Sequence, residues 1–95
     1  MSARERGDKK KNEGNELFKK QKYDEAIRLY SEAIDLDPTS HVYFSNRSAC
    51  YLAQHLWDKA ENDASECVHL NDTFVKGNKD ILYKIIITVH IHNYI

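Results

Sequence analysis

A 34-residue repeat constrains the fold of this chain more than any other feature of its sequence. Residues 7–40 and 41–74 match position by position, small residues with small and large apolar residues with large: Gly14 with Ser48, Leu17 with Tyr51, Tyr23 with Trp57, Asp24 with Asp58, Ala26 with Ala60, Ala33 with Cys67, and Leu36 with Leu70. A repeat of this length marks a supersecondary unit that buries its apolar face only against a neighbouring copy. Such arrays usually form binding surfaces, so the repeat favours recognition over catalysis.

Amphipathic periodicity predicts helices at residues 4–21, 24–36, 40–54 and 58–70. In the second and fourth helices, the apolar residues follow the i, i+4, i+7, i+8 spacing of one helical stripe: Ala26, Tyr30, Ala33 and Ile34, and then Ala60, Ala64, Cys67 and Val68. The connections between the helices are short, which predicts that successive helices pack antiparallel. The predicted fold is therefore all-α and built from antiparallel helix-turn-helix repeats.

Several local signals predict where these helices begin and end. Ser2 followed by Glu5 is the pattern of a capping box at the first helix. The Pro-Thr-Ser stretch at residues 38–40 ends the second helix, and its hydroxyl groups are expected to cap the third. Gly14 lies inside the first helix, where glycine costs about 1 kcal/mol relative to alanine. We expect that cost to be offset by the close approach of a partner helix.

Charge is distributed unevenly along the 95 residues, although the net charge is only −1. Residues 1–22 contain eight Lys or Arg and four Asp or Glu, whereas residues 23–72 contain three and ten. The basic segment suits an acidic partner, or is simply a solvated helix face. The N-terminus is too charged for a signal peptide. The apolar end at residues 81–95 is shorter than the roughly 20 residues that span a membrane. We therefore expect a soluble, cytoplasmic protein without a membrane partner.

The sequence lacks the usual signatures of catalysis and of cofactor binding. It has no nucleophile–base pattern, no Gly-rich phosphate loop and no paired-carboxylate site. Its aromatic residues fall at core positions of the repeat, which argues against a nucleic-acid partner. His90 and His92 have no evident third ligand for a metal ion. Cys50 and Cys67 occupy small, packed positions and are expected to be structural thiols, not a disulfide. We predict that the protein is not an enzyme and uses no cofactor or metal.

Three motifs follow one another in the first repeat: Gly-Asn-Glu-Leu-Phe at 14–18, Tyr-Asp-Glu-Ala-Ile at 23–27, and Leu-Asp-Pro at 36–38. Together they resemble a tetratricopeptide repeat (TPR). The second copy matches less fully, because Asp72 stands where a repeat-ending proline is expected. The run Tyr-Phe-Ser-Asn-Arg-Ser at 43–48 narrows the resemblance to chaperone-binding TPR domains, above all the first such domain of the Hsp-organising (stress-inducible) co-chaperones. The resemblance covers residues 5–77 and implies a TPR α-solenoid.

The resemblance also implies a binding site. In this family, residues that match Lys11, Asn15, Asn46 and Lys76 form most of a carboxylate clamp in a concave groove. The clamp holds the free C-terminus of a chaperone that ends in Glu-Glu-Val-Asp, so the implied partners are heat-shock chaperones of the seventy- and ninety-kilodalton classes. Ammonium groups balance the charge of such a carboxylate, and amide groups fix its direction. Asp80 stands where the family has an arginine, so we expect weakened affinity.

The resemblance sets the predicted domain limits. Residues 1–77 are predicted to form the repeat domain, with repeats at 7–40 and 41–74 and the start of a third at 75–77. Residues 78–95 depart from the pattern, and we attribute them to a retained intron or a frameshift. This tail either lies as a helix over the second repeat or forms an aggregation-prone end.

Three alternatives to a working clamp stay open at this point. Lysines and asparagines on helix surfaces often serve solubility alone. The second alternative is a TPR scaffold that binds another peptide or self-associates through its apolar tail. The third alternative is a truncated isoform without independent activity.

Overall fold

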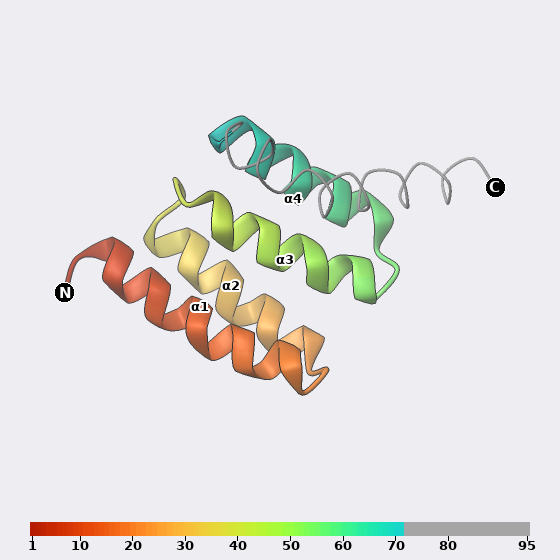
Figure 1. The fold of residues 1–95 in the computed structure, drawn as a ribbon, viewed down its shortest axis with the longest axis horizontal. Coiled ribbons are helices and arrows are strands. Elements are labelled where there is room, and N and C mark those ends of the chain that lie inside the picture. The colour runs from red at the N-terminus through yellow and green to blue at the C-terminus, as the bar shows by residue number, and fades with distance from the viewer. Residues whose placement is uncertain (72–95) are drawn as a thin grey trace.

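The computed structural model describes residues 1–71, which form α1 (Ala3–Lys19), α2 (Tyr23–Leu36), α3 (His41–Ala53) and α4 (Trp57–Leu70). Each helix runs antiparallel to the one before it (Figure 1). The predicted all-α repeat fold is confirmed, and every predicted helix end lies within two residues of the observed one. The expectations for the tail fall outside the described residues, as do those for Lys76, Asp80, His90 and His92.

The helices pack as two hairpins placed side by side. α1 packs against α2, α3 packs against α4, and α2 joins the hairpins by packing against α3. α1 and α3, the first helices of the two repeats, also contact each other. This arrangement brings residues far apart in the sequence onto one face of the molecule (Figure 1).

The two hairpin turns are built from the same backbone bonds at repeat-equivalent positions. Gln21 and His55, which are 34 residues apart, both have φ of 61°. The Gln21 N–H donates to the Phe18 carbonyl at 2.9 Å, and the His55 N–H donates to the Leu52 carbonyl at 3.0 Å. Matching turns explain how two divergent sequences orient their helix pairs alike.

The helix caps agree with prediction at α1 but not at α3. Ser2 Oγ accepts a bond from the Glu5 N–H at 3.1 Å, and the Ser2 N–H donates to Glu5 Oε1 at 3.3 Å, which confirms the capping box. The predicted hydroxyl cap of α3 is wrong, because the Ser40 side chain makes no capping bond. The Thr39 hydroxyl donates instead to Asp37 Oδ1 at 2.6 Å. The Thr39 hydroxyl is therefore engaged by a carboxylate and not by the helix end, and the bonds from Thr39 lower the pKa of Asp37.

Small residues on α2 and α4 let the helices approach closely. The predicted stripes are confirmed at Ala26, Tyr30, Ala33, Ala60, Ala64 and Cys67, all of them buried. Cys50 and Cys67 are free and buried, as expected for structural thiols. Their burial raises the pKa of Cys50 to about 12 and that of Cys67 to about 11.

A largely buried ion pair that the sequence did not predict joins α3 to α4, and its arginine also bonds to α2. On α3, the Arg47 guanidinium donates to both carboxylate oxygens of Asp63 on α4, at 2.7 and 2.8 Å. It also donates to Ser31 Oγ on α2 at 3.0 Å. The hydrogen bonds to Asp63 raise the pKa of Arg47. The ion pair therefore holds α3 against α4 within the second hairpin, and the bond to Ser31 connects the same guanidinium to the first hairpin.

Candidate functional site

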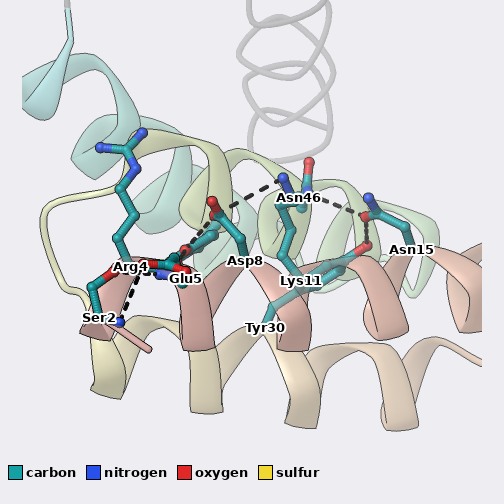
Figure 2. Close-up of polar contacts among 9 residues, drawn as sticks. Ser2, Arg4, Glu5, Asp8, Lys11, Asn15, Tyr30 and Asn46 are labelled. Carbon is teal, nitrogen blue, oxygen red and sulfur yellow. Dashed lines mark hydrogen bonds and ion pairs between the residues drawn. The ribbon is translucent and has the colours of Figure 1, made fainter.

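Three of the four predicted site residues lie in the described part of the chain, and the contact between α1 and α3 brings them together. Lys11 and Asn15 are on α1 and Asn46 is on α3. Asn46 Nδ2 donates a hydrogen bond to Asn15 Oδ1 at 3.2 Å. Figure 2 shows these three side chains gathered between the two helices. The fourth residue, Lys76, lies outside the described residues.

The Asn15 carboxamide is held in one orientation. Its Oδ1 also accepts a hydrogen bond from the Tyr30 hydroxyl on α2 at 2.5 Å. Tyr30 is buried, and its burial raises the pKa of its hydroxyl. Because Asn15 Oδ1 accepts the bonds from both Tyr30 and Asn46, Asn15 Nδ2 points away from these two residues and is available to other acceptors. No hydrogen bond engages Asn15 Nδ2 among residues 1–71.

Lys11 has an acidic neighbour on its own helix. Lys11 Nζ lies 4.0 Å from Asp8 Oδ1, and 23% of the Lys11 side chain is exposed. The same Asp8 oxygen accepts a hydrogen bond from the Tyr43 hydroxyl at 2.6 Å. Burial raises the pKa of Tyr43, and Asp8 raises it further. Asp8 was not among the predicted site residues, although its i, i+3 spacing from Lys11 places both on one helix face.

Two glycines on α1 make room for the tyrosines that hold these polar groups. A methyl group on Gly14 would lie 2.7 Å from Tyr30 Cε1, and one on Gly7 would lie 2.6 Å from the Tyr43 hydroxyl oxygen. The expected close approach at Gly14 is thus confirmed, with a tyrosine ring as the partner. In each case the next residue accepts the hydroxyl: Asn15 after Gly14, and Asp8 after Gly7.

The arrangement presents positive charge and N–H donors on one face. A primary amide has two N–H hydrogens, and a lysine ammonium has three donors. Asn15 keeps both amide hydrogens, Asn46 has one beyond its bond to Asn15, and Lys11 is only partly balanced by Asp8. A carboxylate accepts several hydrogen bonds at once, and charged bonds of this kind are the strong ones. The chemistry therefore fits an anionic ligand with closely spaced oxygens.

Other kinds of site have less support in the described chain. Within residues 1–71, no group of three or more His, Cys, Asp or Glu side chains is placed to hold a metal ion. In the same range, no helix has the length and apolar character to cross a membrane.

Comparison with known proteins supports this description. The TPR repeat family matches residues 14–54. Hsp70-Hsp90 organizing protein 2 of Arabidopsis thaliana is 42% identical over 71 residues, which are 75% of this chain and 12% of that protein. Heat shock protein STI1 of Saccharomyces cerevisiae is 45% identical over 71 residues, which are 74% of this chain and 12% of that protein. The first TPR of Spaghetti (RPAP3), bound to the HSP90 peptide SRMEEVD, superimposes with a TM-score of 0.82 at 28% identity, covering 96% of this chain and 69% of that one.

These findings place the chain in a family. It is a protein of the tetratricopeptide repeat class, in which α1–α2 and α3–α4 each form one helix-turn-helix repeat. Within that class it is homologous to the TPR regions of the Hsp70-Hsp90 organizing proteins. The chain spans about 12% of the length of these curated relatives.

Proposed function

We propose that this protein binds the free C-terminal carboxylate of an acidic peptide on the face shared by α1 and α3. The observation that supports this most directly is the cluster of Lys11, Asn15 and Asn46, in which an ammonium and two amides lie together. A peptide that ends in aspartate offers two carboxylates close together, which matches this set of donors. Lys76 is proposed to add a second ammonium group.

The partners proposed for this site are the C-terminal tails of heat-shock chaperones of the seventy- and ninety-kilodalton classes. The homology to Hsp70-Hsp90 organizing proteins supports this choice. So does the HSP90 peptide on the TPR of Spaghetti, whose sequence ends in Glu-Glu-Val-Asp. We infer a non-catalytic, cytoplasmic binding module.

We also propose that the repeats run over 7–40 and 41–74 and that a third begins at 75. The matching turns at Gln21 and His55 support this frame, because their identical φ values fall 34 residues apart. The proposed domain is residues 1–77, followed by the atypical segment 78–95.

Fluorescence anisotropy with a labelled peptide ending in Glu-Glu-Val-Asp tests the function. The free C-terminus should bind and the amidated one should not, because amidation removes the terminal charge. Asn46→Ala should weaken binding roughly tenfold, since a hydrogen bond to a charged group contributes about 1.5–3 kcal/mol. Asn62→Ala, an exposed position on α4, is the matched control and should leave affinity unchanged. Equal binding of the free and amidated peptides would contradict the proposal.

A further inference from the structure

Asp8 places a carboxylate inside the cluster that is proposed to bind a carboxylate. Its Oδ1 lies 4.0 Å from Lys11 Nζ, and 42% of the Asp8 side chain is exposed. Asp8 and Lys11 rise from the same face of α1 toward α3 (Figure 2). The ammonium that a ligand would contact therefore already has an internal counter-ion.

The Asp8 carboxylate is held in place by its surroundings. Its Oδ1 accepts the Tyr43 hydroxyl at 2.6 Å, and Tyr43 is fully buried. The Tyr43 hydroxyl also lies 3.3 Å from the Arg4 carbonyl oxygen, its second acceptor. Gly7 leaves room for the tyrosine ring beside α1. A side chain anchored in this way cannot swing freely into solvent when a ligand arrives, so its charge stays close to the site.

We propose that the Asp8 carboxylate competes with the ligand carboxylate for Lys11 and so lowers the affinity of the site. This inference rests on the proposed function. A ligand oxygen about 3 Å from Lys11 Nζ would lie within about 7 Å of the Asp8 carboxylate. Like charges at that distance repel appreciably at a partly exposed site. The site is consequently tuned toward weak, readily reversed binding.

Asp8→Asn is the variant that removes the charge and keeps the structure. The asparagine Oδ1 can still accept the Tyr43 hydroxyl, so the packing against Gly7 is preserved. We expect the affinity for the free Glu-Glu-Val-Asp peptide to rise about three- to tenfold. The gain should shrink at about 1 M salt, where the screening length falls to roughly 3 Å. Asp8→Ser, a second neutral variant with a hydroxyl acceptor, should also raise the affinity for the free peptide.

The control is Glu13→Gln, which makes the same change in net charge on the exposed side of α1. It should change affinity less than twofold, and thermal midpoints should show that all variants fold. If both wild type and Asp8→Asn bind the free peptide in preference to the amidated one, and with equal affinity, the inference about Asp8 is overturned and the proposed function stands. Absence of selective binding in both proteins would overturn the proposed function, and this inference with it.

Discussion

The orientation of one amide group is central to the site at the scale of single residues. Asn15 Oδ1 accepts bonds from Tyr30 and from Asn46, which directs the amide nitrogen away from both. Ordering a side chain before its ligand arrives reduces the entropy lost on binding. We therefore expect Tyr30 to be a positioning residue that acts through Asn15.

Tyr30→Phe tests this role directly. The ring still fills the space beside Gly14, but the hydroxyl that holds Asn15 is lost. We expect the affinity for the free peptide to fall about three- to tenfold, in line with the loss of one hydrogen bond. Titration by anisotropy measures this change, with Tyr23→Phe as the control. Affinity for the free peptide that matches wild type would show that Tyr30 serves packing alone.

Gly14→Ala should destabilise the domain although alanine is the better helix former. Alanine gains about 1 kcal/mol in helix propensity. Its methyl group would lie 2.7 Å from Tyr30 Cε1, and Tyr30 is only 1% exposed, so the ring has no room to move. Overpacking of this kind costs about 1–3 kcal/mol, and we expect a net loss in the free energy of unfolding by urea. Asn12→Ala, at an exposed position of α1, should stabilise slightly; a more stable Gly14→Ala variant would contradict the account.

At the scale of helices, the sequence predicted elements well and the contacts between them poorly. Helix periodicity and the Ser2 capping box could be read locally, because each depends on residues within one or two turns. The Tyr30–Asn15 bond could not be predicted, since it depends on the exact crossing of α1 and α2. The cap of α3 was wrongly predicted for a different reason: the Thr39 hydroxyl has a competing acceptor only two residues away in Asp37, a local alternative that the prediction did not include.

The Arg47–Asp63 ion pair was likewise not predicted from the sequence, and its removal should lower the free energy of unfolding substantially. In Asp63→Ala, the guanidinium stays partly buried between the hairpins without its carboxylate. Breaking a buried ion pair from one side costs about 3–5 kcal/mol, a large part of the stability of a small domain. Urea denaturation should show this loss, whereas Glu66→Ala on the exposed face of α4 should cost less than about 0.5 kcal/mol. Similar losses in both variants would show that the ion pair between α3 and α4 contributes no more to stability than an exposed charge.

For the molecule as a whole, the burial of two thiols makes the stability of the folded state depend on pH. Burial raises the pKa of Cys50 to about 12 and that of Cys67 to about 11, above the ordinary thiol value. Folded thiols therefore keep their protons when the thiols of the unfolded chain lose theirs. This contribution is fully present below the unfolded pKa of about 9 and is lost as pH rises toward 11–12. Thermal midpoints should accordingly fall from pH 9 to pH 11.

The double variant Cys50→Ala/Cys67→Ala separates the thiols from other groups that titrate in this range. Its midpoint should fall less steeply with pH than that of the native protein. Parallel curves for the two proteins would show that burial of the thiols does not govern the pH dependence.

The proposed function requires that a free terminal carboxylate binds between α1 and α3. Two-dimensional NMR of the side-chain amide groups is a direct test, because Asn15 and Asn46 each carry a primary amide with two N–H hydrogens. Addition of the free Glu-Glu-Val-Asp peptide should shift both pairs, and the amidated peptide should leave them in place. Shifts confined to other residues, or equal shifts with the amidated peptide, would contradict the account.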